Sequence, residues 1–404
     1  MNKYQIKCVH CGTVTPSFAL WFLQNQCCPN CKSKHAEVEY DTDYATLPSL
    51  LTGKPESFWH YFDFLPLLDK AHIVTCKEGA IPVENWEFLD KYAHDNFQVD
   101  CRVMVYRNDL NGGTNTFKDV AASLAASIFK ETAIHNFCVA STGNTATAFS
   151  KYLSLAGVKF TVFVPACVSA DSVEEMRSWG QEVVIADGDY AYAKKMAAEY
   201  AIDNAVLISA GNIDPIRVEA KRTMVFEFLR QMGSMPDIYI QAVSGGTGPI
   251  AIDKGVREIQ NFFPEVTLPR MLLVQQDLCD PMVSAWENAQ KNGFPDGYEK
   301  IYPVIDNPQT TVSILSTGNP GMFPVIAPIV KKSNGTFLRI NESELVDFAR
   351  IVQHEKGIIL GPASMVCLAG FYQALKERQI HNGETVLVNI GEGAVRSKEF
   401  ASKL

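Results

Sequence analysis

The most constraining feature of the chain is a regular alternation of short apolar segments with helix-like segments from about residue 101 onward. The strand-like runs are residues 103–106, 136–140, 160–164, 182–186, 238–243, 271–274 and 385–390. Intervening segments such as 119–131 and 145–156 have the composition of helices. Short buried strands that alternate with helices form parallel sheets covered on both faces. The sequence therefore predicts an α/β fold.

The length and composition narrow the class of protein further. A chain of 404 residues is too long for one simple core, so we expect two or three domains. The net charge of −9 argues against a nucleic-acid partner, which requires a basic face. No apolar run reaches the roughly 18 residues that span a bilayer, and the first residues lack a signal-peptide pattern. We expect a cytoplasmic protein without a membrane partner, although residues 402–404, Ser-Lys-Leu, also match a peroxisomal address.

The first 40 residues carry a separate cysteine pattern. Cys8 and Cys11 form one C-x2-C pair, and Cys28 and Cys31 form a second pair after 16 intervening residues. This spacing favours a tetrahedral zinc site, and four thiolates leave no open position for a substrate, so the zinc is expected to be structural. The alternatives are four incidental buried cysteines, or a site in which Cys27 replaces one ligand.

Lys118 lies in a loop with an unusual composition. Residues 111–119 read Asn-Gly-Gly-Thr-Asn-Thr-Phe-Lys-Asp, and Thr116 is among the candidate substrate-binding residues. About 23 residues later the chain reads Ser-Thr-Gly-Asn-Thr at 141–145. A lysine in a Gly/Thr-rich loop, followed by such a turn, is what Schiff-base chemistry with pyridoxal 5'-phosphate (PLP) on an amino acid requires. The alternative is a solvated surface lysine.

The turn at 141–145 is expected to hold the substrate. Its hydroxyl and backbone N–H groups are candidate partners of an α-carboxylate, and its members are Ser141, Thr142, Gly143, Asn144 and Thr145. Asn144 is also expected to hydrogen-bond the phenolic oxygen of the cofactor. A simple N-cap of the following helix is the alternative role for a Ser or Thr at this position.

A glycine-rich turn between a strand and a helix is expected to hold the cofactor phosphate. The residues are Ser244, Gly245, Gly246, Thr247 and Gly248. Glycines let backbone N–H groups approach a phosphate, and a helix N-terminus adds a positive dipole end. Ordinary turn chemistry is the alternative. The loop lacks both the lysine of a nucleotide-binding P-loop and the dinucleotide fingerprint.

A third group of polar residues follows at 212–221. Arg217 and Lys221 are four residues apart and share one helix face, and with Asn212 they are candidates for binding an anionic leaving group such as phosphate. The alternative is a surface helix face with Glu219 nearby.

Taken in order, these motifs resemble the fold-type II PLP enzymes, and within them the threonine synthase group. The similar segments are residues 111–120, 141–144, 212–223 and 355–364. The chain also resembles cysteate synthase, a threonine synthase relative, in its Thr-Phe-Lys-Asp loop and in residues 281–286, Pro-Met-Val-Ser-Ala-Trp. The resemblance implies a tryptophan synthase β-like fold with two parallel-sheet, three-layer domains and an N-terminal zinc-ribbon-like segment.

The resemblance also implies domain boundaries and an assembly. Residues 1–40 would form the zinc-ribbon-like segment, 41–125 with 215–404 the large PLP-binding domain, and 126–214 a small mobile domain. A homodimer is expected, because homodimers are common in the family.

The implied activity is a lyase or transferase reaction of amino-acid biosynthesis on an activated, O-phosphorylated amino acid. Lys118 would bind PLP and act as general base. The reaction would be threonine synthase-like, from O-phosphohomoserine and water to threonine and phosphate, or a cysteate synthase-like β-replacement of O-phosphoserine with sulfite.

One departure from the family pattern concerns the pyridine nitrogen of the cofactor. These families place a Ser or Thr there, whereas Gly391 or Glu392 falls at this position here. A carboxylate such as Glu392 would favour a protonated pyridine. The altered site also leaves open a non-catalytic binding or regulatory protein on the same fold.

Overall fold

The computed structural model describes residues 3–141 and 143–404, so Thr142 lies outside the described residues. The chain divides into two compact units. Unit 1 comprises Met1–Ala80, Gly112–Thr114 and Lys118–Met224, and unit 2 comprises Ile81–Asn111, Asn115–Phe117 and Val225–Leu404. The mobile domain expected at residues 126–214 is defined by its motion, and it stays a prediction.

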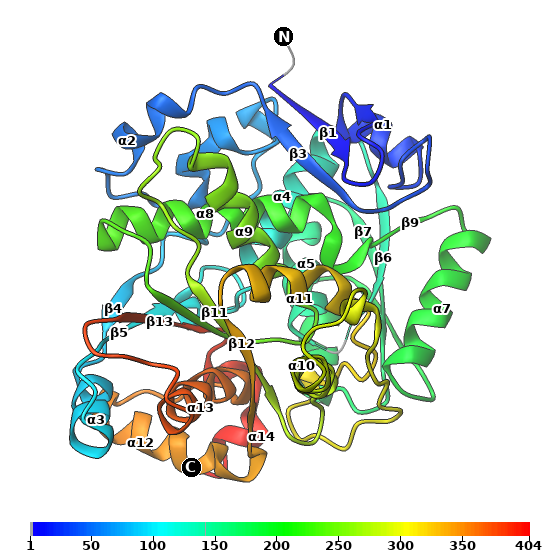
Figure 1. The fold of residues 1–404 in the computed structure, drawn as a ribbon. Coiled ribbons are helices and arrows are strands. Elements are labelled where there is room, and N and C mark those ends of the chain that lie inside the picture. Colours follow the sequence, from blue (N-terminus) through cyan, green and yellow to red (C-terminus); the bar gives the residue numbers. More distant parts are fainter. Residues whose placement is uncertain (1–2, 142) are drawn as a thin grey trace. The chain divides into compact units, whose positions relative to one another are not determined.

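Unit 1 begins with a small antiparallel sheet of order β2-β1-β3. Its strands are β1 (Tyr4–Cys8), β2 (Val14–Thr15) and β3 (Ala36–Tyr40), and α1 (Phe18–Leu23) lies between β2 and β3 in the chain. Alternate residues of β1 are buried, as expected for a strand with one face on a core. The Ser17 hydroxyl caps α1 by accepting a hydrogen bond from the Leu20 amide. This segment appears in dark blue in Figure 1.

The following part of unit 1 is aromatic-rich and lacks long elements. It contains α2 (Leu47–Leu50) and a 3₁₀ helix at Phe58–Phe64. The Trp59 indole donates to the Ser123 hydroxyl at 2.9 Å, and the Ser127 hydroxyl accepts from the Val74 amide at 2.9 Å. These bonds attach the segment to α4 (Asp119–Glu131), the helix that begins directly after Lys118.

The main sheet of unit 1 is parallel, with the order β8-β7-β6-β9. The strands are β6 (Asn136–Ala140), β7 (Lys159–Val164), β8 (Glu182–Ile185) and β9 (Leu207–Ile208). The connecting helices are α5 (Asn144–Leu155), α6 (Ala170–Ser178) and α7 (Tyr190–Asp203). Stacked rings of Phe137, Phe149 and Phe160 fill the space between the sheet and α5. Helix α8 (Pro215–Met232) then begins in unit 1 and continues into unit 2.

Unit 2 is built on a six-stranded sheet of order β12-β11-β10-β13-β5-β4, in which only β4 runs antiparallel to its neighbour. The strands are β4 (Val83–Asn85), β5 (Arg102–Arg107), β10 (Ile238–Ala242), β11 (Arg270–Gln276), β12 (Thr336–Ile340) and β13 (Thr385–Ile390). Strand β13, the last in the chain, therefore lies inside the sheet between β10 and β5.

The helices of unit 2 cover this sheet. They are α3 (Glu87–Phe97), α9 (Thr247–Ile259), α10 (Pro281–Lys291), α11 (Phe323–Lys332), α12 (Leu345–Lys356), α13 (Pro362–Lys376) and α14 (Lys398–Ala401). Helix α13 is buried along almost its whole length. Gly370 permits its close approach to the sheet, since a Cβ there would overlap the Val274 side chain.

The α/β fold with parallel sheets that the sequence predicts is confirmed. Among the described residues, no helix combines the length and the apolarity that crossing a membrane requires.

Candidate active site

We call residues 111–118 the lysine loop. Its residues Gly112–Thr114 belong to unit 1 and are held there by buried side chains. Gly113 has φ +99°, and a Cβ there would overlap the Tyr152 hydroxyl and come within 2.7 Å of Asp119 Oδ1. The Thr114 amide and hydroxyl both donate to Asp119 Oδ1, at 2.9 and 2.8 Å. The Lys151 ammonium donates to the Gly113 carbonyl at 2.7 Å. The glycine of the motif is therefore required by a close approach that no other residue permits.

Tyr152 depends in turn on a buried carboxylate that the sequence analysis missed. Its hydroxyl donates to Glu78 Oε2 at 2.7 Å, and Glu78 also accepts from the Cys76 amide at 2.7 Å. Burial, and then the carboxylates of Glu78 and Asp119, raise the pKa of Tyr152, so it remains a neutral donor. Glu78 stands 40 residues before Lys118 in a segment without a motif, and no sequence signal pointed to it.

The three residues directly before Lys118 belong to unit 2 and pair with the exit of β13. The Phe117 amide donates to the Gly391 carbonyl at 2.9 Å, and the Gly393 amide donates to the Asn115 carbonyl at 3.1 Å. Thr116 forms an isolated antiparallel bridge with Glu392. The lysine loop and the Gly391–Glu392 position, far apart in sequence, are thus brought together within this unit.

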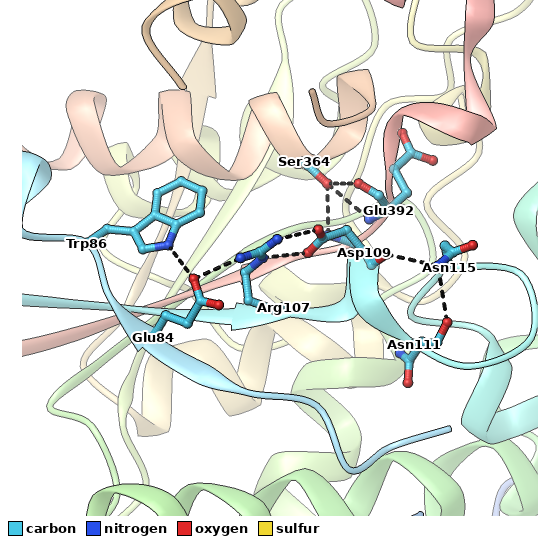
Figure 2. Close-up of polar contacts among 9 residues, drawn as sticks. Glu84, Trp86, Arg107, Asp109, Asn111, Asn115, Ser364 and Glu392 are labelled. Atoms are coloured by element: carbon cyan, nitrogen blue, oxygen red, sulfur yellow. Dashed lines mark hydrogen bonds and ion pairs between the residues drawn. The ribbon is translucent and has the colours of Figure 1, made fainter. Parts of the chain in front are cut away.

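Glu392 is buried, and one of its carboxylate oxygens lies at the start of α13. Oε1 accepts from the Ala363 amide at 3.0 Å, and a Cβ at Gly361 would lie 2.5 Å from that oxygen. Ser364 accepts from the Gly391 and Glu392 amides and donates to the Glu392 carbonyl, as Figure 2 shows in part. A carboxylate at the positive end of a helix is stabilised in its ionised form. Contact of Glu392 with the cofactor stays a prediction.

The turn after β6 has the geometry of a helix start. The Ser141 hydroxyl accepts from the Gly143 amide at 3.2 Å and from the Ala146 amide at 3.1 Å. Ser141 and Gly143 are buried, whereas Asn144 and Thr145 are half-buried in the first turn of α5. Ser141 thus accepts from an amide in the first turn of α5, although the N-cap residue itself is Gly143, and carboxylate binding by this turn stays a prediction.

Arg217 and Lys221 are both buried, so the interpretation of this helix face as solvent-exposed is wrong. Arg217 is 7 % and Lys221 is 2 % exposed. Burial lowers the pKa of Lys221 well below its ordinary value, and the positive charges of Lys118 and Arg217 lower it further. The structure thus brings the candidate Schiff-base lysine and the two candidate anion-binding residues into one electrostatic cluster. We call Lys118, Arg217 and Lys221 the cation cluster.

Arg217 is only partly satisfied by its surroundings. Its guanidinium donates to Ser209 Oγ at 2.7 Å and lies 4.9 Å from the Phe149 ring. Its Nε is buried, and no hydrogen-bond partner for it is found in residues 3–141 and 143–404. Asp214 and Tyr190 are the groups whose charges favour the guanidinium, and burial raises the pKa of both. Tyr190 was also missed from the sequence.

The remaining residue of the predicted anion site is Asn212. It is half-buried in a 3₁₀ turn, Gly211–Ile213, just before α8. Asp214 follows, and its Oδ1 accepts from the Ile216 amide at 3.0 Å, which caps the start of α8. The candidate anion-binding residues Asn212, Arg217 and Lys221 thus lie just before α8 or in its first two turns, and anion binding by them stays a prediction.

In unit 2, the glycine-rich turn links β10 to the N-terminus of α9, as predicted. Gly246 has φ +70°, and a Cβ there would overlap the Ile326 side chain, while a Cβ at Gly248 would overlap Gln241 Oε1. Ser244 is half-buried, and Gly245 and Thr247 are buried. Glycines are therefore required at these two positions, and the turn lies at the positive end of a helix, where an anion such as a phosphate group is stabilised.

A chain of neutral hydrogen bonds crosses the core of unit 2. Asn111 donates to Asn108 at 2.9 Å, and Asn108 donates to Asn389 at 2.6 Å. Asn389 donates to the Tyr239 hydroxyl at 2.5 Å, which donates to Gln241 at 2.7 Å. Asn111 Nδ2 also donates to the Thr116 carbonyl at 3.0 Å. This neutral network connects the sheet to the lysine loop, and its sequence signal was a lone asparagine in the apolar strand 385–390.

The four cysteines of the N-terminal segment converge. The sulfur atoms of Cys8, Cys11, Cys28 and Cys31 all lie within 4.8 Å of one another, whereas Cys27 donates to the Gln24 carbonyl at 2.9 Å. Both pairs form the same turn, since the Gly12 amide donates to the Cys8 carbonyl and the Lys32 amide to the Cys28 carbonyl, each at 3.0 Å. Four convergent sulfurs fit a metal that prefers thiolate ligands.

Comparisons with known proteins agree with this arrangement. Residues 86–391 match the family described as pyridoxal-phosphate dependent enzyme. A threonine synthase from Methanocaldococcus jannaschii is 26 % identical over 355 residues, covering 86 % of this chain and 84 % of that protein. A cysteate synthase from Methanococcoides burtonii is 26 % identical over 418 aligned positions, covering 99 % of this chain and 91 % of that protein.

Solved structures share the fold at lower sequence identity. A fungal L-serine ammonia-lyase from Rhizomucor miehei superposes with a TM-score of 0.63 at 16 % identity, covering 81 % of this chain and 98 % of that chain. A threonine deaminase from Solanum lycopersicum gives a TM-score of 0.61 at 15 % identity, covering 87 % of this chain and 95 % of that chain. The chain belongs to the pyridoxal-phosphate dependent enzyme family, with the fold-type II architecture of the threonine synthase and cysteate synthase group.

Proposed function

We propose that the protein catalyses a PLP-dependent elimination or replacement on an O-phosphorylated amino acid. The observation that carries this proposal is the burial of Arg217 and Lys221 near the start of α8, where Arg217 Nε has no hydrogen-bond partner among the described residues. A buried guanidinium N–H without an acceptor is unfavourable unless a ligand supplies one. A phosphate leaving group on the substrate would supply it.

The residues present fit the cofactor. Lys118 would hold PLP covalently, the backbone of Ser244–Gly248 would hold its phosphate, and Asn144 and Glu392 would contact its ring. The support is the glycine-rich loop at the N-terminus of α9, where Gly246 and Gly248 have no room for a Cβ. When bound, PLP stabilises negative charge at the α-carbon of an amino acid.

The chain's own residues would then divide the remaining tasks. The freed Lys118 amine would take the α-proton. Thr116 and the turn at 141–145 would orient the α-carboxylate, Thr142 included. Asn212, Arg217 and Lys221 would bind the phosphate and stabilise it as it leaves.

Two substrates fit these groups equally well. The threonine synthase relatives support O-phosphohomoserine with water as the nucleophile, and the cysteate synthase relative supports O-phosphoserine with sulfite. Both carry a phosphate for the cation cluster and a carboxylate for the Ser141 turn. The two substrates differ by one methylene, so the chemistry of the cluster does not separate them.

The deciding experiment follows the visible absorbance of the PLP-loaded protein during titration with O-phosphoserine, O-phosphohomoserine and O-acetylserine. We expect the band to shift, with phosphate release, for one of the two phosphorylated compounds and not for O-acetylserine. Phosphate released from O-phosphoserine in the presence of sulfite would identify β-replacement, and threonine formed from O-phosphohomoserine would identify the γ-reaction. A shift with O-acetylserine alone would contradict the proposed phosphate site.

We further propose that the four-cysteine site binds structural zinc, and that the protein is a cytoplasmic homodimer. The zinc proposal is supported by four sulfurs within tetrahedral reach and two equivalent turns. Metal analysis of the purified protein would give one zinc per chain, and sedimentation would give twice the chain mass of 44.7 kDa.

A further inference from the structure

We infer that the cysteine segment, residues 3–40, positions the anion-binding end of α8, and that Gln26 and Tyr40 are the positioning residues. The inference rests on the proposed function, because it concerns the phosphate-binding residues assigned there. Both contacts lie within unit 1, which contains the cysteine segment and the cation cluster. We call residues 3–40 the cysteine ribbon.

The first contact joins the second cysteine pair to the residue that holds Arg217. Gln26 precedes Cys27 and Cys28, is 4 % exposed, and donates from Nε2 to the Ile208 carbonyl at 2.6 Å. Ile208 is followed by Ser209, whose hydroxyl accepts a hydrogen bond from the Arg217 guanidinium at 2.7 Å. Two hydrogen bonds and one peptide unit therefore separate the cysteine ribbon from the substrate-binding arginine.

The place of Ile208 in the sheet makes this bond significant. Strand β9 is two residues long and lies at the edge of the parallel sheet, where only β6 pairs with it among the described strands. The Ser209 amide bonds to the Cys138 carbonyl of β6, so the preceding carbonyl of Ile208 points to the open edge. Gln26 supplies a hydrogen bond at that edge and limits the movement of Ser209.

The second contact holds the opposite face of α8. Tyr40, the last residue of β3, donates to Glu219 Oε2 at 2.7 Å, and Glu219 also accepts from Arg222 Nε at 2.9 Å. Both Glu219 and Arg222 are completely buried, and the Arg222 guanidinium lies 4.8 Å from the Tyr40 ring. At about 100° per residue, this pair is roughly 150° around the helix from Arg217 and Lys221.

These two contacts set the position and rotation of the helix that carries the cations. Gln26 acts on the hydrogen-bond partner of Arg217, and Tyr40 acts on the back of α8. A misplacement of about 1 Å in a positioned group can lower a reaction rate by roughly a hundredfold, so small shifts of Arg217 matter. The cysteine ribbon therefore has a role in substrate affinity in addition to its role in folding.

The test compares Gln26→Glu with Gln24→Glu in the full-length, PLP-loaded protein. Gln26→Glu replaces the donor with a carboxylate that faces the Ile208 carbonyl. Gln24 lies two residues away, and its Oε1 accepts from Thr15 within the ribbon, a bond that a glutamate retains. Tyr40→Phe is a second variant that keeps the ring and removes only the hydroxyl. The measurements are the Kd of inorganic phosphate by calorimetry, the KM and kcat for the phosphorylated substrate, and the Tm.

We expect Gln26→Glu to weaken phosphate binding about tenfold and to raise KM more than it lowers kcat, because Arg217 loses its fixed partner. Tyr40→Phe should act in the same direction, and Gln24→Glu should bind phosphate like the wild type. If Gln26→Glu does not fold, Tyr40→Phe alone decides the outcome. Wild-type affinity in the folded Gln26 and Tyr40 variants, whatever their Tm, would overturn the inference.

Arg217→Ala separates this inference from the proposed function. Loss of phosphate binding in Arg217→Ala, with unchanged binding in the Gln26 and Tyr40 variants, would disprove only the positioning role. Absence of phosphate binding by the wild type, in both calorimetry and competition with substrate, would disprove the proposed function and this inference together.

Discussion

The two units both bury polar groups near the lysine loop, but they satisfy them differently. In unit 2, Arg107 forms a two-bond pair with Asp109 and a third bond with Glu84, as Figure 2 shows. The neutral network through Asn389 is also closed by short hydrogen bonds. In unit 1, by contrast, Arg217 of the cation cluster has a buried Nε that is unpartnered among the described residues.

On the proposed function, this difference separates polar groups that maintain the fold from polar groups that bind a ligand. A buried group with all its partners contributes to stability, and removing one partner leaves the others unsatisfied. A buried charge without balance lowers stability and is retained where binding uses it. The unit 2 network should therefore respond to mutation through folding, and the cation cluster through binding.

The largest effect should come from Lys118→Ala, which removes the lysine proposed to bind PLP and to accept the α-proton. We expect loss of the visible absorbance band after addition of PLP, and a fall in turnover of at least about 10³-fold, because both the covalent link and the proton acceptor are lost. Lys130→Ala, on the exposed end of the same helix α4, is the matched control. A retained band with retained turnover would show that another lysine holds the cofactor.

Asn389→Leu should be the most destabilising change in the unit 2 network. It removes the acceptor of Asn108 Nδ2 and the donor to the Tyr239 hydroxyl, which lowers the free energy of unfolding by about 2–4 kcal/mol. Urea denaturation measures the change, with Asn96→Leu on the exposed surface of α3 as control. An equal loss in the two variants would mean that the network does not carry stability.

Lys221→Met should produce the opposite pattern. Removing a buried charge should raise the free energy of unfolding by about 1 kcal/mol or leave it unchanged, since the depressed pKa reports the penalty for that charge. Phosphate binding should weaken about tenfold or more. Urea denaturation measures the free energy of unfolding, and calorimetry on the same preparation measures phosphate binding. A large loss of stability would show that Lys221 maintains the fold.

The pH dependence sharpens the same contrast. The pKa of Lys221 is lower in the folded protein than in the unfolded chain, so between the two values the unfolded chain binds more protons. Stability should therefore rise with pH in that window. Phosphate affinity should fall by up to about tenfold per pH unit as Lys221 loses its proton. Lys221→Met should remove the pH dependence of both stability and phosphate affinity. If either dependence persists in this variant, another group causes it.

The smallest effect is expected for Ser141→Ala. Loss of the hydroxyl that accepts from the Gly143 and Ala146 amides should lower the free energy of unfolding by about 1 kcal/mol. If the turn also holds the substrate carboxylate, KM should rise while phosphate affinity stays the same. A change in phosphate affinity would instead link the turn to the cation cluster.

Local patterns in the sequence predicted much of the fold and part of the site. The strand–helix alternation gave the parallel sheets, and the cysteine spacing gave the cluster of sulfurs, because both depend on residues that are close in the chain. The spacing of Arg217 and Lys221 gave their common face. It did not give their burial, because burial depends on segments such as residues 137–160 and 208–209 that pack around α8.

The residues that sequence reasoning missed act over long separations. Glu78, Tyr152 and Gln26 hold the lysine loop or β9 through hydrogen bonds between residues 40 to 182 positions apart. A glutamate or glutamine in such a position looks the same as one in solvent. Asn389 is different, since a single amide in an apolar strand must find a partner, and that signal was present.

The place of β13 in its sheet has a consequence for synthesis on the ribosome. Strand β5 pairs with β4 and β13, and β13 separates β5 from β10. Strand β5 is made near residue 102, but its parallel partner is complete only at residue 390. The four strands of the unit 1 parallel sheet are all made by residue 208. The nascent chain can therefore finish the half that contains Lys118 while a gap remains inside the other sheet, so a stop codon just before Thr385 would remove the strand that joins its two parts.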